Sequence, residues 1–303
     1  MTSTDHNRLL GLIAAAAAVV VWGSSSVLVK NIEGLSGLVI GFHRMWIGAA
    51  LTSIAFLAAG GRFSWRLMRA SCAGGIAFAL DIVLFFSALK ETSVANATII
   101  GAMQPVLVLA VARRLFGERP HLRDAFWAAV AIAGAVIVVA GGPAGGDASL
   151  HGDLLAVAAL VAWTWYFIAS KQARTHLGSF EYLAGLSIVA VVTVTPIVLL
   201  SGESIAVPTT ADWVYIVIVA LVNGALGHFL MNWAHAHVPI VVTSLMTLGI
   251  PVFATATAAI FIDEPVTLLQ VFGMGVVIGA LAVVVIHTSR QVPDVVEPPV
   301  ASS

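Results

Sequence analysis

Charged residues are scarce in this chain. Asp, Glu, Lys and Arg make up 10% of its 303 residues, whereas they make up about a quarter of a soluble domain. Hydrophobic residues account for 60%, and the mean hydropathy is +1.02. This composition excludes an ordinary soluble domain and indicates a membrane protein, whose immediate partner is the lipid bilayer.

An excess of one charge sign and a supply of cysteine are also lacking. The 14 basic and 15 acidic residues leave a formal net charge of −1, so there is no basic surface and we expect no nucleic-acid partner. The single cysteine, Cys72, excludes an intramolecular disulfide and a thiolate metal site. We therefore expect no cofactor and no metal, and the sequence identifies no protein partner.

Long apolar runs are abundant. A helix needs about 20 apolar residues to cross a bilayer, because lipid offers no hydrogen-bond partner to the backbone. Ten such runs predict an all-α polytopic membrane protein with ten transmembrane helices. The first run is longer than the apolar part of a cleavable signal peptide, so we interpret it as a permanent helix. The runs lie near residues 9–29, 38–59, 67–89, 94–116, 122–141, 154–170, 182–200, 213–236, 240–262 and 268–287.

The basic residues fall mostly on one side of these predicted helices. Cytoplasmic loops carry an excess of Lys and Arg, and an even number of spans returns the chain to its starting side. With the N-terminus inside, eleven of the 14 lie on inner segments, so both the N and C termini are predicted to be cytoplasmic. The inner set is Arg8, Arg62, Arg66, Arg69, Arg113, Arg114, Arg119, Arg123, Lys171, Arg174 and Arg290; the outer links hold Lys30 and Lys90, and Arg44 lies within the second run.

The second half of the sequence repeats features of the first. Pro105 and Glu118 match Pro251 and Glu264 at a constant separation of 146 residues, and after one deletion the register continues at 145. Each copy holds five helices, an odd number, so the second copy crosses the membrane in the opposite sense. Two inverted five-helix repeats are typical of secondary transporters, which bind substrate near the midplane. The alternative is a duplicated membrane scaffold.

The predicted organisation follows from this duplication. It comprises a cytoplasmic N-terminus at 1–8, a first repeat at 9–141, a linker at 142–151, a second repeat at 152–288 and a disordered cytoplasmic tail at 289–303.

The repeated pattern resembles a known family. A small-residue-rich helix with a mid-span proline and a Glu-Pro or Glu-Arg-Pro corner is similar to the two EamA-type repeats of the drug/metabolite transporter superfamily. Within it, the sequence looks most like the bacterial aromatic amino-acid exporters. The resemblance implies ten helices, a multi-pass location in the bacterial inner membrane and export of amino acids or related metabolites. It rests on Gln104-Pro105 to Glu118-Arg119-Pro120, on Ile250-Pro251 to Glu264-Pro265, and on Trp22-Gly23-Ser24-Ser25-Ser26 in the first helix.

Pro105 and Pro251 each lie about halfway along a span. Proline removes a backbone hydrogen bond and kinks a helix, so the pair are candidate hinges, although proline also occurs in membrane helices for packing reasons. Glu118 and Glu264 fall at span ends, where we expect corner residues that hold the turn into the next helix.

Arg44 is costly inside a membrane and needs a partner or water. It lies six residues, or about 9 Å, below the outer end of its span, and Asp81 lies eight residues, or about 12 Å, below the outer end of the next. These similar depths predict an Arg44/Asp81 pair that serves as a structural clamp or as a binding point for a zwitterion.

Polar groups recur along the eighth run at Asn223, His228 and Asn232. Lipid would leave them unsatisfied, so they should point into the bundle, where they serve interhelical hydrogen bonding or ligand contact. His43, beside Arg44, is expected to pack.

A cavity for an amino acid needs apolar walls and a few polar anchors. Gln104, next to the first repeated proline, is a further polar candidate. About half of the aromatic and thioether candidates are expected to face the cavity, and the others to pack between helices. These candidates are Trp22, Phe78, Phe85, Met103, Trp163, Tyr166, Phe229 and Met246.

The sequence therefore predicts an exporter of aromatic or large neutral amino acids, or of related small metabolites, that works by alternating access. The first helix lacks the acidic residue that small multidrug exporters use for proton exchange, so strong proton coupling is not expected. The alternatives are export of other metabolites or drugs by proton antiport, a channel or scaffold, and an intramembrane enzyme. No serine-hydrolase motif or paired mid-span carboxylates support an enzyme.

Overall fold

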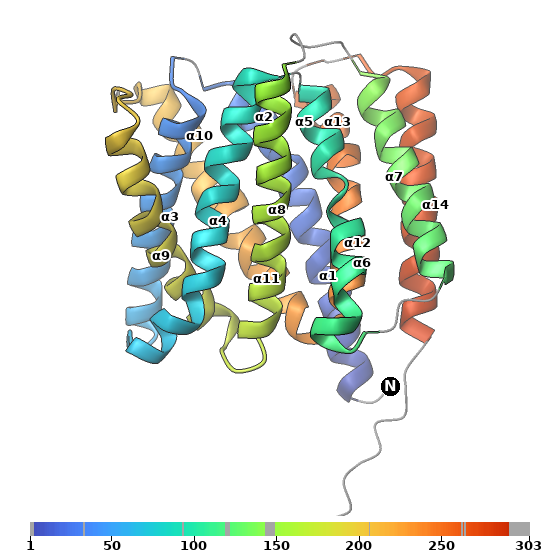
Figure 1. The fold of residues 1–303 in the computed structure, drawn as a ribbon, viewed down its shortest axis with the longest axis horizontal. Coiled ribbons are helices and arrows are strands. Elements are labelled where there is room, and N and C mark those ends of the chain that lie inside the picture. Colours follow the sequence, from blue (N-terminus) through green and yellow to red (C-terminus); the bar gives the residue numbers. More distant parts are fainter. Residues whose placement is uncertain are drawn as a thin grey trace, which may run out of the picture.

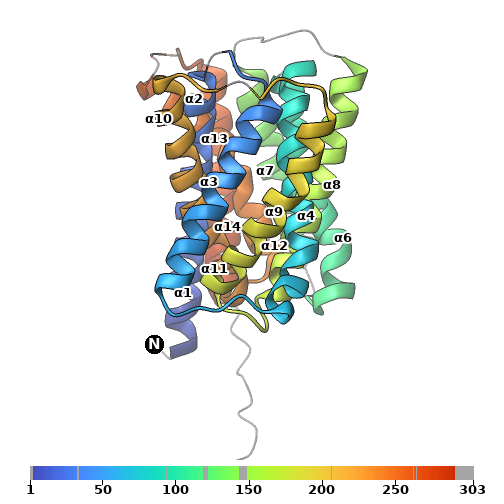
Figure 2. The same ribbon diagram turned by 90° about the vertical axis from the view of Figure 1, so that its left-hand side faces the viewer.

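The structure is a computed structural model, and it describes residues 3–32, 34–92, 94–118, 122–142, 149–205, 207–261, 263 and 265–290. The regular structure in these residues is helical, and the helices stand side by side in one bundle (Figure 1). Seen from the side, they run between two ends where the connections lie (Figure 2). We call the end that holds the start of α1 the inner end, after the charge-based prediction.

The first half of the chain forms seven helices that build five spans. They are α1 (Ser3–Gly23), α2 (Ser25–Lys30), α3 (Gly37–Ala58), α4 (Trp65–Glu91), α5 (Val94–Gly101), α6 (Gln104–Phe116) and α7 (Leu122–Ala140).

The second half forms five further spans. It contains α8 (Leu150–Ala173), α9 (Ser179–Leu200), α10 (Thr210–Ile218), the π-helix η1 (Val219–Leu226), α11 (Gly227–His237), α12 (Ile240–Met246), the 3₁₀ turn η2 (Thr247–Gly249), α13 (Ile250–Phe261) and α14 (Leu268–Arg290).

The predicted ten-helix architecture is confirmed. Among the described residues, nine helical stretches are long and apolar enough to cross a membrane, and α7 adds a shorter apolar stretch, Ala125–Ala140. Several helices are longer than the apolar runs: α1 begins at Ser3 and α8 covers Leu150–Ala173. The reason is that polar end turns continue the backbone hydrogen bonds beyond the hydrocarbon layer. Ile262, the end of the ninth run, lies outside the described residues.

Serine and threonine caps fix where several spans begin. The Ser36 hydroxyl accepts the Val39 N–H at 3.2 Å at the start of α3, and the Ser64 hydroxyl accepts the Leu67 N–H at 3.2 Å at the start of α4. Thr209 caps α10 in the same way. Such a cap satisfies one of the N–H groups that a helix leaves unpaired at its start.

The fourth and ninth spans are interrupted at equivalent places. α5 stops at Gly101 and α6 begins at Gln104, whereas α12 passes through η2 before α13 begins at Ile250. Pro105 and Pro251 are therefore each the second residue of the half-helix that follows the break. A proline fits this first turn because the turn needs no N–H donor there.

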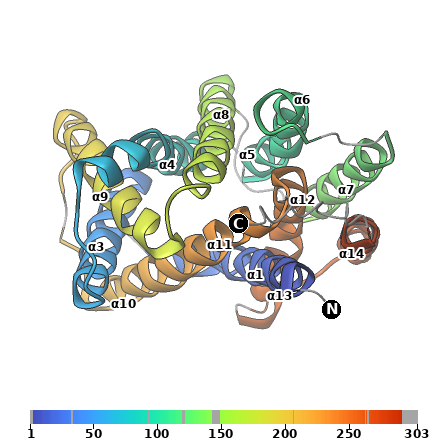
Figure 3. The same cartoon turned by 90° about the horizontal axis from the view of Figure 1, so that it is seen from below.

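The two halves are inverted, and helices of one half pack against helices of the other. α1 rises from the inner end whereas α8 descends towards it, and α14 ends beside the start of α1 (Figure 1). α4 packs on α8, and α11, from the opposite half, packs on α1. The view along the bundle shows α7 beside α14 at one edge and α3 beside α9 at the other (Figure 3). The predicted inverted-repeat fold is thereby confirmed.

Glu118 links the two repeats at the inner end. Gly117 ends α6 with a left-handed φ of 67°, and the Glu118 carboxylate then accepts the backbone N–H groups of Ile240, at 2.8 Å, and Val241, at 3.2 Å. It thereby caps α12 in the other repeat. The turn before α12 is also held by Lys171, which donates to the Val238 carbonyl at 2.6 Å. Glu264, its counterpart, lies outside the described residues.

Candidate functional site

A cavity of about 210 Å³ lies between the two repeats. It extends from mid-depth towards the outer end: α4 contributes residues from Asp81 to Phe86, near its outer end, and α8 contributes residues from Ala156 to Trp163. On the inner side of the cavity, Tyr166, with its neighbour Phe167, is fully buried. The cavity is thus closed towards the inner end by packed aromatic side chains.

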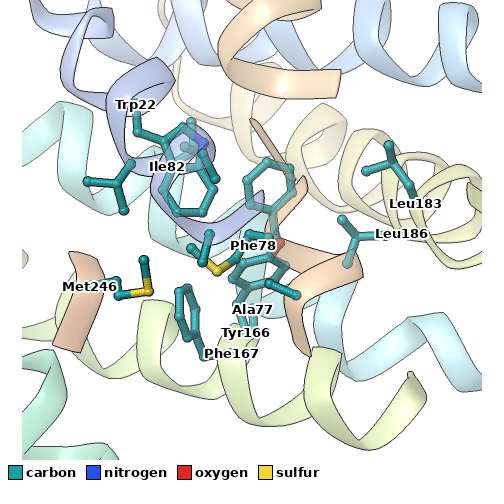
Figure 4. Packing of buried hydrophobic residues seen from close by; sticks show 14 of the residues in the cluster. Trp22, Ala77, Phe78, Ile82, Tyr166, Phe167, Leu183, Leu186 and Met246 are labelled. Atoms are coloured by element: carbon teal, nitrogen blue, oxygen red, sulfur yellow. The ribbon is translucent and has the colours of Figure 1, made fainter. Parts of the chain in front are cut away.

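Aromatic rings form the floor of the cavity. Trp22 meets Trp163 edge to face at a centroid distance of 5.2 Å, and Trp163 stacks on Tyr166 at 5.3 Å. Phe78 lies edge-on to His228 at 4.4 Å. Figure 4 shows Trp22, Phe78 and Tyr166 gathered in one interior region. Such packed rings present an apolar wall to any ligand above them.

A chain of polar side chains passes through this aromatic cluster. Arg44 Nη2 lies 3.3 Å from His228 Nε2, and His228 Nδ1 lies 2.8 Å from the Tyr166 hydroxyl. The Tyr166 hydroxyl in turn donates to Asn232 Oδ1 at 3.5 Å. The chain connects α3 of the first repeat with α8 and α11 of the second.

The two charged side chains of the cavity do not pair directly. Arg44 and Asp81 both line it, but no ion pair joins them in the part of the chain that the structure describes, and Arg44 binds His228 instead. The expected contact was inferred from matching depths. Depth along two helices does not fix how each is rotated, so residues at one level can face a common cavity without touching.

Trp22 and Asn223 bind the first span to the eighth. Trp22 Nε1 donates to the Asn223 carbonyl at 3.1 Å, and Asn223 Nδ2 donates to the Val21 carbonyl. The Asn223 carbonyl is in the π-helix η1, a backbone form that occurs frequently at functional sites. Gly227 gives the indole room, since a Cβ there would lie 2.6 Å from Trp22 Nε1.

The structure brings together about half of the predicted site residues. Three others, Phe78, Tyr166 and Asn232, contact the cavity-lining residues through ring contacts and hydrogen bonds. Met103 and Met246 do not line the cavity, and Phe229 packs near Phe180 at 6.5 Å. The predicted residues that line the cavity are Trp22, Arg44, Asp81, Phe85, Trp163, Asn223 and His228.

Sequence reasoning missed residues at the two helix breaks. Gly101 and Thr247 both line the cavity, and each lies four residues before its repeated proline. The Thr247 hydroxyl donates to Gln104 Oε1 at 3.2 Å, so the two breaks are hydrogen-bonded to each other. Pro251 also lines the cavity, whereas Pro105 does not. The constant register of the repeats was the signal that could have located Gly101 and Thr247.

Comparison with known proteins identifies the family. The profile of the EamA-like transporter family matches residues 9–140 and again residues 150–286. This chain belongs to the EamA-like transporter family. The resemblance to the two EamA-type repeats is thus confirmed, and the multi-pass helical architecture fits this family.

Two curated relatives from bacteria match parts of the chain. An uncharacterized transporter, YetK, of Bacillus subtilis is 24% identical over 222 residues, which are 72% of this chain and 66% of that protein. A probable terminal-alkyne amino-acid exporter of Streptantibioticus cattleyicolor is 27% identical over 132 residues, 43% of each chain. The matches thus span less than two thirds of either relative. A solved crystal structure superposes with a TM-score of 0.78 at 18% identity, covers 92% of this chain and 99% of its own, and supports the fold alone.

Proposed function

We propose that this transporter exports amino acids with aromatic or large neutral side chains, or closely related metabolites, across the bacterial inner membrane by alternating access and without strong proton coupling. The observation that carries the proposal is an aromatic cavity between inverted repeats that is lined by one basic side chain, Arg44, and one acidic side chain, Asp81.

The charges of the cavity favour a zwitterion. Arg44 uses Nη2 to bind His228, and among the described residues no ion pair joins Arg44 to Asp81, so each side chain can bind an opposite charge on a ligand. An α-amino acid carries a carboxylate and an ammonium group close together. A phosphorylated substrate would need several cations, and Arg44 is the one basic side chain among the Lys and Arg residues that lines the cavity in the described part of the chain.

The size and walls of the cavity favour a small ligand with an apolar side chain. Its volume of about 210 Å³ is below the range of about 300–1,000 Å³ typical of drug-sized pockets. Trp22, Phe85 and Trp163 offer aromatic faces to a side chain. These features support an amino acid over a bulky drug.

Two further observations support export of amino acids. One bacterial relative is named a probable terminal-alkyne amino-acid exporter, and the sequence pattern resembles the bacterial aromatic amino-acid exporters.

Residues 9–23 of α1 hold no acidic side chain that could exchange a proton with substrate. This supports a carrier that moves its substrate down the solute gradient.

Alternating access would proceed at the repeat interface. The cavity reaches towards the outer end and is closed on the inner side, so loading from the cytoplasm requires the inner ends to separate. The helix breaks before Pro105 and Pro251 are places where half-helices can tilt, because the continuous ladder of backbone hydrogen bonds is already interrupted there. We assign the hinge role to these two prolines.

The test is counterflow in proteoliposomes loaded with unlabelled amino acid. We expect saturable entry of labelled tryptophan, phenylalanine or leucine that does not depend on an imposed pH gradient, with protein-free liposomes as the baseline. Absence of counterflow for every amino acid would refute the proposal. Flux of cationic drugs that requires a pH gradient would favour proton antiport instead.

A further inference from the structure

Arg44 is held from one side by a histidine of the opposite repeat. Its Nη2 lies 3.3 Å from His228 Nε2, and both side chains are buried, at 7% and 2% exposure. The guanidinium carbon lies 5.8 Å from the centroid of the Phe78 ring, and a Cβ on Gly224 would lie 3.7 Å from Arg44 Nε. The Arg44 side chain is therefore positioned by three helices while it lines the cavity.

The direction of each hydrogen bond between Arg44, His228, Tyr166 and Asn232 follows from the chemistry of the arginine side chain. A guanidinium can only donate, so His228 Nε2 must accept. A neutral imidazole with an accepting Nε2 carries its proton on Nδ1, which then donates to the Tyr166 oxygen at 2.8 Å. The Tyr166 hydroxyl proton is left to donate to Asn232 Oδ1. One arrangement of protons is consistent with all three hydrogen bonds that join these four side chains.

We propose that His228 is a positioning residue for substrate recognition: as a neutral acceptor it holds Arg44 so that the guanidinium meets the carboxylate of the substrate, and Tyr166 fixes the required tautomer. This inference rests on the proposed transport of amino acids and names how that site recognises one of their two charged groups.

The surroundings of His228 fit this role. The charged and titratable groups near it are Arg44 on α3, Asp81 across the cavity on α4, Tyr166 on α8 and His235 on its own helix. The remaining neighbours are aromatic rings, with Trp22 at 5.0 Å and Phe78 at 4.4 Å. Among the described neighbours, Arg44 is thus the group that fixes Nε2 as an acceptor, and the apolar rings exclude competing water.

A purely structural bond between α3 and α11 would give a different result on mutation. It would change expression or the flux of all substrates alike. A positioning role changes the discrimination between a ligand with a carboxylate and one without it, because only the former uses Arg44.

The experiment compares inhibition of tryptophan counterflow by unlabelled tryptophan and by tryptophanamide, in which the carboxylate is replaced by a neutral amide. We expect the wild type to prefer tryptophan by about tenfold or more, the size expected for one charged hydrogen bond. His228→Leu should abolish this preference, because it weakens inhibition by tryptophan far more than inhibition by the amide. His228→Gln, which retains an acceptor and a donor, should preserve most of it, and Tyr166→Phe should fall between.

His235→Leu is the matched control. His235 lies on the same helix, is 1% exposed and does not line the cavity, so this variant should leave the preference unchanged. An unchanged preference in His228→Leu, or an equal loss in His235→Leu, overturns the proposal, and so does a wild type that binds both ligands equally. In these cases the proposed transport of amino acids is retained and only the role of His228 is refuted. A wild type without counterflow refutes both. If His228→Leu does not fold, the graded result of His228→Gln and Tyr166→Phe decides.

Discussion

The carboxylate of Glu118 should control how readily the inner end of the bundle opens. It joins the end of α6 to the first turn of α12, in the opposite repeat, through the N–H groups of Ile240 and Val241. Loading from the inner side requires these ends to separate, so the two hydrogen bonds should be present only while the inner end is closed. Removing them is expected to raise the population that is open towards the inside.

The magnitude follows from the geometry. A side-chain cap of a helix is worth about 0.5–2 kcal/mol, and Glu118 supplies two bonds of 2.8 and 3.2 Å from a half-buried carboxylate. We expect Glu118→Ala to cost the closed state about 2 kcal/mol, which raises the open-to-closed ratio roughly thirtyfold. Glu118→Gln keeps one acceptor oxygen, so it should cost about 1 kcal/mol, roughly fivefold.

Cysteine labelling measures this population. The chain has one cysteine, so Cys72→Ser gives a background without thiols. Leu245 lies on α12, between the inner end and the helix break at mid-depth, and is fully buried, so Leu245→Cys should react with maleimide only when the inner end opens. The labelling rate of this reporter should rise by the same factors in the Glu118 variants, provided that opening and closing are fast compared with labelling.

A carboxylate at the same end provides the control. Glu181 accepts the N–H of Gly178 at 3.4 Å at the start of its own helix, and in the described part of the chain it forms no hydrogen bond to the other repeat. Glu181→Ala should therefore leave the labelling rate of the Leu245→Cys reporter unchanged. Equal rates in Glu118→Ala and its parent, at unchanged thermal stability, would show that the cap does not hold the inner end closed.

Two other substitutions test the cavity. Gly227→Ala places a Cβ 2.6 Å from Trp22 Nε1, so the indole must shift and lose its hydrogen bond to the Asn223 carbonyl. We expect the protein to lose about 1–3 kcal/mol of stability and its counterflow to fall, and adding Trp22→Phe should partly restore both. Normal melting and normal flux in Gly227→Ala would contradict this. Asp81→Asn should weaken inhibition by tryptophan about tenfold without affecting its analogue that lacks the amino group, and an equal effect on both ligands would show that Asp81 does not bind the ammonium group.

The span count and the inversion could be predicted because they depend on one-dimensional features. A bilayer forces each apolar run into a helix whatever its neighbours are, so hydropathy alone located ten spans. The repeated Pro105 and Pro251 showed the duplication, and the odd number of spans per copy then required inversion. None of these steps requires knowledge of which helices are in contact.

The contacts of the site could not be predicted, because they depend on rotation and on partners distant in sequence. Arg44 and Asp81 share a depth, but the partner of Arg44 is His228, 184 residues away. Glu118 looks like a corner of its own repeat, yet it binds the backbone of Ile240, 122 residues away. Met246 resembles a cavity residue in the sequence, but packing turns it into the core.

The internal polar contacts lie largely where the two repeats meet, and this has a mechanical consequence. Gln104 binds Thr247 at mid-depth, Glu118 binds Ile240 at the inner end, and the Thr92 hydroxyl donates to Asp153 at 2.7 Å at the outer end. A hydrogen bond is directional and is lost over a short displacement. An interface held by such bonds at both ends therefore favours a few discrete arrangements over a continuum. Breaking one set while the other is intact would let one end of the bundle move at a time, which is what alternating access requires.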